Sequence, residues 1–388
     1  MSTTAPAVAD VYNIFDLRER ARRFLPKGVF EYVERGTENE AGLQDNLAAF
    51  DRVKLVPRVL RDVTQIDYSS ELFGKPIPMP VVVGPTGAAG FVWFEGDLKL
   101  ARAAAAAGVP FTISSASTLP MEKIVTAGGR LWFQLYPWED RELTYGLVKR
   151  ANELGCEALV ITVDTAVAPN REYNSRNGFG VPLRMNRRNV PDVLLHPRWA
   201  LQVLLPQLVK HGIVAQSNAP KGMRGSLTTM QPVGSAFRND NLTWDEINKL
   251  RDMWRGQVLL KGVVSPQDAD LAARAGLDAI IASNHGGRNL DPTVAPLDAL
   301  PGILNAVGGR MPVLVDSGVR RGSDIVKALA LGAKAVLVGR PVLYGLGTAG
   351  QAGVECALGM LRDELRRTMA LCGCRSIAEI DRELLFAP

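Results

Sequence analysis

The feature that most constrains the fold is a repeated unit in which a helix-like segment ends at a glycine, two residues follow, and a short apolar run begins. Glycine just past a helix can adopt the left-handed conformation that turns the chain toward the next element. The apolar runs are continuous rather than alternating, which is typical of parallel strands covered on both faces. Four units of this kind begin at Gly108, Gly155, Gly276 and Gly332.

Eight short apolar runs occur in all, and helix-like segments separate them. They span residues 80–84, 111–114, 132–136, 158–163, 258–262, 279–283, 312–317 and 335–339. Eight strands that alternate with helices predict an α/β fold of the (β/α)₈ TIM-barrel type. A doubly wound sheet is the alternative, and it requires a reversal of strand order that a sequence cannot reveal.

Three regions lie outside this rhythm, and we interpret the whole chain, residues 1–388, as one domain with the barrel over 76–350. Residues 1–75 predict a helical lead-in, 175–240 a long insertion after the fourth strand, and 351–388 C-terminal helices. Inside the barrel, Ser265 and Asp97 each precede a helix-like segment and are expected to cap it.

Composition and charge exclude several classes of protein. The chain carries a formal charge of +5 but has no basic, aromatic-rich stripe, so we expect no nucleic-acid partner. The four cysteines fit neither a disulfide framework nor a zinc site, so we expect no metal and a reducing, cytoplasmic setting. The first residues lack the pattern of a secretory signal, and no apolar run approaches the ~18 residues of a membrane span.

Polar residues follow every predicted strand at its carboxyl end, which is where barrels carry their active sites. A purely structural barrel has little reason to place polar groups at the same end of all eight strands, so we expect a functional site there. The residues are Thr86, Gly87, Ser114, Ser115, Gln134, Tyr136, Thr162, Asp164, Lys261, Ser283, Asn284, His285, Asp316, Gly339 and Arg340.

The segments after the last two strands predict a phosphate site. Residues 316–323 read Asp-Ser-Gly-Val-Arg-Arg-Gly-Ser and open a helix, and Arg340 follows the eighth strand. Gly318 and Gly322 would let backbone N–H groups approach an anion, which a helix N-terminus also attracts. The alternative is a pair of glycine turns with solvated arginines.

His285 is the most informative single residue. It lies in Ser-Asn-His-Gly-Gly-Arg, directly after a buried strand, and Arg288 follows three residues later. A base beside a guanidinium that can bind a carboxylate suits proton abstraction from a small hydroxy acid. Asp164 could orient the imidazole and stabilise its charged form. Lys261 could form a Schiff base or stabilise negative charge, and we favour the second role.

Two other patterns are set aside. Gly345-Leu-Gly-Thr-Ala-Gly350 matches the dinucleotide-binding fingerprint letter by letter, but no βαβ unit with a suitable acid follows, so we interpret it as the lead into a helix. Cys372-Gly-Cys374 has no second pair of ligands, which argues against a metal site.

Several stretches together resemble the FMN-dependent 2-hydroxy-acid oxidase and dehydrogenase family. They are WFQLY at 132–136, SNHGGRNLD at 283–291, VDSGVRRGSD at 315–324 and VGRP at 338–341. The resemblance runs over nearly the whole chain, from Leu25-Pro26-Lys27 onward. It implies FMN as the cofactor and oxidation of a small 2-hydroxy acid to the 2-oxo acid.

The resemblance also implies roles for individual residues. His285 would take the hydroxyl proton while hydride passes from the α-carbon to flavin N5, with Asp164 paired to His285. Tyr32, Tyr136, Arg171 and Arg288 would bind substrate. The flavin ring would contact Thr86, Gly87, Ser114, Gln134, Thr162, Lys261 and Ser283, and the ribityl and phosphate groups would contact Asp316, Gly318, Arg320, Gly339 and Arg340.

Departures from the family pattern refine these expectations. Asn289 stands where the family usually has Gln, and this difference could shift the loop behind Arg288. Glycine at position 87 resembles the dehydrogenase members of the family, whereas oxidase members often have alanine at this position. With Ala88 and Ala89 it leaves space for a large side chain, so we expect an (S)-mandelate-like substrate first and lactate second.

The insertion supplies a further expectation, for residues 185–215. Basic residues there flank an apolar stretch with Trp199, a pattern that suits shallow docking on an anionic bilayer and resembles a membrane-associating segment of the family. Electrons would then pass to a membrane quinone, with the protein a peripheral homotetramer on the inner face of the cell membrane. Packing against the barrel or a neighbouring subunit is the alternative.

Three other functions remain open from sequence. A soluble oxidase would return electrons to oxygen and release hydrogen peroxide. An FMN-dependent diphosphate isomerase would need to bind a diphosphate rather than a carboxylate between Arg171 and Arg288. A non-catalytic binding barrel would leave the pairing of His285 with Arg288 unexplained.

Overall fold

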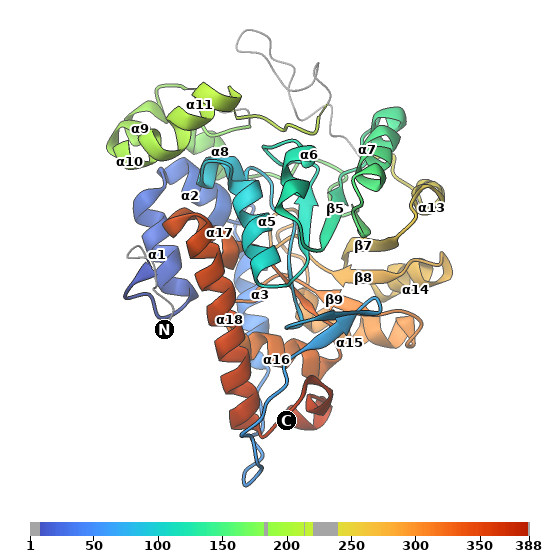
Figure 1. The fold of residues 1–388 in the computed structure, drawn as a ribbon. Helices are drawn as coiled ribbons and strands as arrows, with labels where there is room; N and C mark the ends of the chain where they lie inside the picture. The colour runs from blue at the N-terminus through green and yellow to red at the C-terminus, as the bar shows by residue number, and fades with distance from the viewer. Residues whose placement is uncertain (1–7, 182–184, 213, 220–239, 387–388) are drawn as a thin grey trace.

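Eight parallel strands close into a barrel in the computed structural model, which describes residues 8–181, 185–212, 214–219 and 240–386 (Figure 1). The barrel closes where β10 pairs with β3, and every other strand pairs with its neighbour in the chain. All eight predicted strands are therefore confirmed, and the doubly wound alternative is excluded. The strands are β3 (Val81–Val83), β4 (Phe111–Ser114), β5 (Leu131–Leu135), β6 (Ala158–Thr162), β7 (Gln257–Val263), β8 (Ala279–Ala282), β9 (Val313–Val315) and β10 (Val336–Val338).

The barrel interior is a packed core whose upper layer is polar. Side chains alternate between the two faces of a strand, so every second residue of each strand points inward. Trp132, Val160, Leu259, Ile281 and Leu314 belong to one buried cluster inside the barrel. The inward positions two residues further along these same strands are Gln134, Thr162, Lys261, Ser283 and Asp316.

The lead-in is helical only in its first part. It forms α1 (Ile14–Phe24), α2 (Lys27–Glu34) and α3 (Ala41–Arg52), followed by an antiparallel hairpin of β1 (Ser70–Leu72) and β2 (Lys75–Ile77). The helical interpretation of 1–75 is wrong for this hairpin. Leu72 and Ile77 join the interior cluster, so the hairpin covers the amino-terminal end of the barrel.

The barrel helices begin at caps that the sequence predicted only in part. Ser265 accepts the N–H of Asp268 and is a cap, as expected. Asp97 is not a cap, because it is fully buried and instead accepts from the N–H and hydroxyl of Thr118. The helices are α4 (Ala89–Val92), α5 (Gly96–Ala106), α6 (Met121–Ile124), α7 (Arg141–Glu153), α13 (Trp244–Met253), α14 (Pro266–Arg274), α15 (Pro296–Val307) and α16 (Gly322–Leu331).

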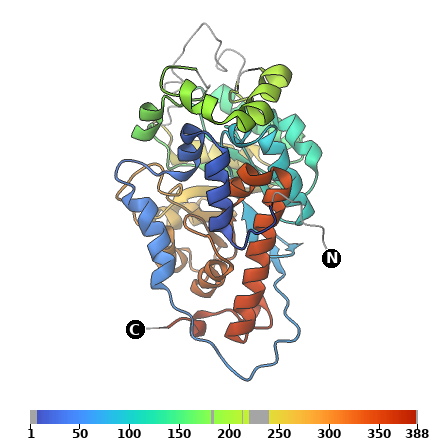
Figure 2. The ribbon, with the colours of Figure 1, turned by 90° about the vertical axis from the view of Figure 1, so that its left-hand side faces the viewer.

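The insertion forms short helices that lie together at one end of the molecule in both views (Figures 1 and 2). Trp199 is buried and donates its indole N–H to the carbonyl of Phe91 at 2.8 Å, so this part of the insertion packs on the barrel. The helices are α8 (Glu172–Asn177), α9 (Val190–Leu195), α10 (Pro197–Trp199), a π-helical turn (Ala200–Leu204) and α11 (Leu205–His211). Among the described residues, no helix has the length and apolar character required to cross a bilayer.

Two helices complete the fold. α17 (Arg340–Ala349) follows the last strand within the predicted barrel region, and α18 (Gln351–Cys372) lies in the region predicted to form C-terminal helices. They cross closely at Gly345 and Gly353, where a Cβ on either residue would collide with the carbonyl oxygen of the other. Gly345 and Gly347 thus lie within α17, where the absence of a side chain allows close packing against neighbouring helices. This packing accounts for the glycines of the apparent dinucleotide-binding fingerprint, so no bound nucleotide is needed to explain them.

We expect Gly353→Ala to destabilise the protein by roughly 1–3 kcal/mol, because the added methyl group must push α17 and α18 apart. Gly359→Ala in the same helix is the matched control, since a Cβ there meets nothing within 4 Å. That variant should be stabilised by roughly 0.5–1 kcal/mol through the higher helix propensity of alanine. Urea unfolding of both variants measures the difference, and equal effects would refute the close crossing.

Candidate active site

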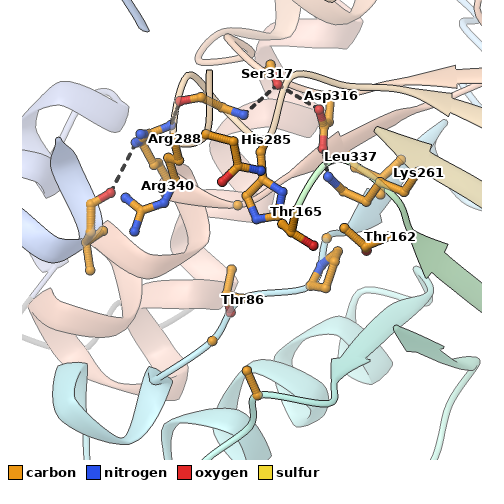
Figure 3. Close-up of a pocket in the computed structure, with 18 of the residues that line it drawn as sticks. Thr86, Thr162, Thr165, Lys261, His285, Arg288, Asp316, Ser317, Leu337 and Arg340 are labelled. Carbon is orange, nitrogen blue, oxygen red and sulfur yellow. Dashed lines mark hydrogen bonds and ion pairs between the residues drawn. The ribbon is translucent and has the colours of Figure 1, made fainter. Parts of the chain in front are cut away.

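A cavity of about 410 Å³ opens at the carboxyl ends of the strands, and most of the predicted site residues line it (Figure 3). Those that line it are Tyr32, Thr86, Gly87, Tyr136, Thr162, Arg171, Lys261, His285, Arg288, Asp316, Gly318, Arg320, Gly339 and Arg340. Ser114, Gln134, Asp164 and Ser283 do not line it, but each hydrogen-bonds to another predicted site residue, whereas Asn284 hydrogen-bonds to Asn46 of the lead-in.

His285 is held in one orientation by two polar neighbours. Its Nδ1 lies 2.8 Å from a carboxylate oxygen of Asp164, and its Nε2 lies 3.1 Å from the hydroxyl of Tyr136. The carboxylate can only accept, so Nδ1 carries the proton, and the lone pair of Nε2 accepts from the hydroxyl of Tyr136. The His285 backbone has φ +59, a left-handed conformation that costs roughly 1–2 kcal/mol in a residue other than glycine.

Burial and charge set the protonation of this pair. Burial lowers the pKa of His285 below its ordinary value, and the charges of Lys261 and Arg171 act in the same direction, although Asp164 opposes them. Burial alone would raise the pKa of Asp164, but the charge and hydrogen bond of His285 and the charge of Lys261 hold it below its ordinary range. At neutral pH the pair is therefore a carboxylate beside a neutral imidazole, which is the state of a competent base.

Two guanidinium groups beside His285 have no carboxylate partner within the described residues. Arg171 donates to the carbonyl of Arg288 at 3.2 Å, and Arg288 donates to the carbonyl of Arg35 and lies 5.1 Å from the ring centre of Tyr32. Burial and then the charge of Arg288 lower the pKa of Arg171. Two adjacent, unpaired cations in a cavity constitute a site for an anion such as a carboxylate.

Asn289, the departure noted in the sequence, connects this arginine pair to the base. Its amide nitrogen donates to the carbonyl of Asp164 at 2.8 Å, and its amide oxygen accepts from Arg171 at 3.4 Å. Asparagine at this position therefore holds the loop behind Arg288 against the loop that carries Asp164.

Lys261 forms an ordered polar cluster on the other side of His285 in the view of Figure 3. Its Nζ lies 2.9 Å from Asp316 and donates to Ser283 at 2.7 Å. Burial alone would lower the pKa of Lys261, but the charges of Asp316 and Asp164 outweigh burial and raise it. Lys261 is therefore a fixed positive charge at neutral pH, which does not suit Schiff-base chemistry.

A second polar cluster belongs to strands β4, β5 and β6. Ser114 donates to Gln134 at 2.9 Å, and Gln134 donates to Thr162 at 2.9 Å. All three side chains are buried, and the chain of hydrogen bonds fixes the direction in which each group points. The hydroxyl of Thr86 on the cavity wall is buried and has no partner among the described residues.

The segments after β9 and β10 form the cationic end of the cavity. Arg320 and Arg340 both line it, and both lie beside the start of a helix, α16 or α17. Arg340 donates to the carbonyls of Val33, Glu34, Arg35 and Gly286, so it also fixes the lead-in to the loop that carries His285. Burial, followed by the charges of Arg288 and Arg320, lowers the pKa of Arg340 to about 10.

Sequence reasoning missed several residues of the cavity. Ser317 has φ +71 and its hydroxyl bridges Asp316 to the N–H of Gly286, a role that no sequence pattern indicates. Gln216 comes from the insertion, far from any predicted strand. Ala88 and Ala89, expected to leave space beside Gly87, lie in the hydrophobic core instead of the cavity wall.

Comparison with known proteins gives the family. Residues 21–387 match the FMN-dependent dehydrogenase family. The chain is 40% identical to (S)-mandelate dehydrogenase of Pseudomonas putida over 377 residues, which is 97% of this chain and 94% of that protein. It is 39% identical to L-lactate dehydrogenase of Alcaligenes faecalis over 373 residues, covering 95% and 97%. It is also 39% identical to L-lactate oxidase of Nostoc sp. over 384 residues, covering 98% and 99%.

A solved structure agrees with these relatives. The crystal structure of the monotopic membrane protein (S)-mandelate dehydrogenase superposes with a TM-score of 0.90 at 40% identity, covering 98% of this chain and all of that one. Matches of this extent exclude the diphosphate isomerase and the non-catalytic barrel as interpretations of the chain. The chain therefore belongs to the FMN-dependent dehydrogenase family and is an enzyme that oxidises a 2-hydroxy acid.

Proposed function

We propose that the enzyme oxidises an (S)-2-hydroxy acid with an aromatic side chain, mandelate before lactate, and uses His285 as the base. The observation that carries the proposal is the position of a neutral imidazole, oriented by Asp164 at 2.8 Å, beside the unpaired guanidinium groups of Arg171 and Arg288. A 2-hydroxy acid presents a carboxylate and a hydroxyl on adjacent carbons, and this pair of groups matches the site.

The chain's own residues provide binding, orientation and proton transfer. Arg171 and Arg288 bind the substrate carboxylate with Tyr32, and this places the hydroxyl beside Nε2 of His285 and the hydroxyl of Tyr136. His285 takes the hydroxyl proton at Nε2, and the carboxylate of Asp164 stabilises the imidazolium that forms. FMN, when bound, would accept the hydride from the substrate's α-carbon at its N5.

The residues present fit FMN. The cationic end formed by Arg320, Arg340 and two helix starts suits its phosphate group. The partnerless hydroxyl of Thr86 and the ordered groups of Ser114, Gln134 and Thr162 suit the polar edge of its ring. Lys261 and Ser283 would lie where a fixed positive charge stabilises a reduced, anionic flavin. Asp316, Gly318 and Gly339 complete this part of the wall.

Gly87 supports the choice of a large side chain. A Cβ at this position would lie 3.3 Å from that of Ala116 and 3.8 Å from the hydroxyl of Tyr32, so glycine keeps open the space between these two residues. The space adjoins the carboxylate-binding arginines through Tyr32, which lies against Arg288. It therefore lies where the α-substituent of a bound 2-hydroxy acid would point.

The insertion supports a membrane quinone as the electron acceptor. Its outer face exposes apolar side chains around the buried Trp199, and a homologous solved structure is described as monotopic. An exposed apolar face with basic neighbours is suited to shallow insertion in a bilayer. The exposed residues are Met185, Leu194, Leu195, Leu201, Leu205, Leu208 and Val209. The chain is 39% identical to an L-lactate oxidase, about as similar as it is to the dehydrogenases, and this supports oxygen as the second candidate acceptor.

Anaerobic mixing of the FMN-loaded enzyme with (S)-mandelate, (S)-lactate and glycolate tests the substrate. We expect mandelate to bleach the flavin absorbance fastest and lactate second, because only the aromatic side chain fills the space beside Gly87. Oxygen consumption and peroxide release are then measured under air. Faster bleaching by glycolate would contradict the proposed substrate, and stoichiometric peroxide would replace the quinone with oxygen.

The assignment of His285 as the base predicts a specific pH profile for flavin reduction. His285 must be neutral to act, and its pKa is lowered, so kcat/KM should rise with pH to a plateau and its acid limb should have a pKa below the ordinary 6.5. His285→Gln should bind FMN normally, lose roughly 10²- to 10⁴-fold in the rate of reduction, and lose this limb.

His196→Gln is the matched control, because His196 lies in the insertion and does not line the cavity. It should keep both the rate and the pH profile. A His285→Gln enzyme with full activity would remove His285 from the mechanism.

Membrane docking predicts that charge on the outer face of the insertion abolishes vesicle binding. The triple variant Leu194→Asp, Leu195→Asp and Leu201→Asp should no longer sediment with phosphatidylglycerol vesicles, while anaerobic flavin reduction by substrate is unchanged. Val59→Asp with Leu60→Asp is the control, because these exposed residues lie in the connection between α3 and β1, at the opposite end of the molecule (Figures 1 and 2). Equal sedimentation of the two variants with the vesicles would contradict the proposal that this face of the insertion docks on the membrane.

A further inference from the structure

Residues 214–219 of the insertion form a segment that is fixed to the barrel by hydrogen bonds. Ser217 donates its N–H to the carbonyl of Ser117 at 2.9 Å and its hydroxyl to the carbonyl of Thr118 at 2.7 Å. The amide oxygen of Asn218 accepts the first N–H of α6 at 2.9 Å, and Asn218 is buried. The segment is thereby fastened to the loop that follows β4.

Gln216 extends from this segment to the cavity wall, where no described residue engages its amide oxygen. Its Oε1 is buried and has no hydrogen-bond partner within the described residues. An amide oxygen left unpaired in a buried position costs roughly 1–3 kcal/mol, so it is a group that a ligand can satisfy. The terminal torsion of a glutamine is broad, so the amide can present its oxygen or its nitrogen to the cavity.

A continuous wall connects the carboxylate-binding arginines to this amide. Arg288 lies against the ring of Tyr32, whose hydroxyl is 3.8 Å from the Cβ position of Gly87. The Cβ position of Gly87 is in turn 3.3 Å from the Cβ of Ala116. Ser117, which follows Ala116, accepts the N–H of Ser217 from the segment that carries Gln216. The loops after β8 and β4, from which Arg288 and Ala116 come, lie four strands apart in the eight-stranded barrel and therefore on opposite sides.

We propose that Gln216 determines specificity by hydrogen bonding to a polar group at the far end of the substrate's side chain. The chemical class that it selects is a 2-hydroxy acid with a hydroxyl group on its aromatic side chain, over the same acid without it. A hydroxyl both donates and accepts, so it pairs with either end of the amide. The inference rests on the proposed function, because it requires the carboxylate to bind at Arg171 and Arg288.

Anaerobic stopped-flow reduction with (S)-4-hydroxymandelate and (S)-mandelate tests the inference. The wild-type enzyme should bind the hydroxylated acid roughly three- to tenfold more tightly, which is the effect of one neutral hydrogen bond. Gln216→Met keeps the length of the side chain and removes the amide, so the two dissociation constants should become equal because binding of the hydroxylated acid is weakened. Val167→Ala is the control, because Val167 lines the same cavity without a polar group, and its ratio should match the wild type.

The outcomes separate the two proposals. If neither acid reduces the flavin of the wild-type enzyme, the proposed function fails and the inference fails with it. If both acids reduce the flavin but the ratio is the same in the wild type and in Gln216→Met, only the inference is overturned. A Gln216→Met enzyme that loses affinity for FMN with an unchanged ratio also overturns it, because the amide would then serve the cofactor.

Discussion

The alternation of side chains along closed strands is the constraint on which the rest of the structure depends. Closure of β10 onto β3 leaves no free edge, so each strand must give every second residue to the interior. The lower interior positions are filled with apolar side chains, and the position above them on five successive strands is polar, from Gln134 to Asp316. One geometric rule thus produces both a dry core that stabilises the barrel and a polar floor for the site.

The charge of the cavity is strongly unbalanced. Among the described residues, five cationic side chains line it, Arg171, Lys261, Arg288, Arg320 and Arg340, against the one carboxylate of Asp316. Cations in a partly buried site are stable only where polar groups surround them, and backbone carbonyls of the lead-in provide much of that environment. The arrangement favours two anionic groups bound at separate places, a phosphate beside Arg320 and Arg340 and a carboxylate beside Arg171 and Arg288, over neutral ones.

The sequence revealed those parts of the fold and site that have a local pattern. Glycine-terminated helices and continuous apolar runs predicted all eight strands, and the polar residues after them predicted a large part of the polar cavity wall, including His285, Lys261 and Asp316. The hairpin of β1 and β2 was missed because its strands have three residues each, too few for a period to appear. The prediction that Asp97 caps a helix is wrong because its carboxylate instead accepts a buried hydrogen bond from Thr118. The presence of Gln216 in the cavity could not be predicted from sequence, because only tertiary contacts of its segment bring it to the site.

Arg340 joins the two ends of the chain, because it begins α17 and donates to carbonyls at the end of α2. Tyr344, one turn further along α17, hydrogen-bonds to Glu34 on the same helix α2. During synthesis, then, the first forty residues leave the ribosome long before the segment that secures them. The pocket therefore cannot be complete on a nascent chain until Arg340 and the start of α17 have been synthesised and have emerged.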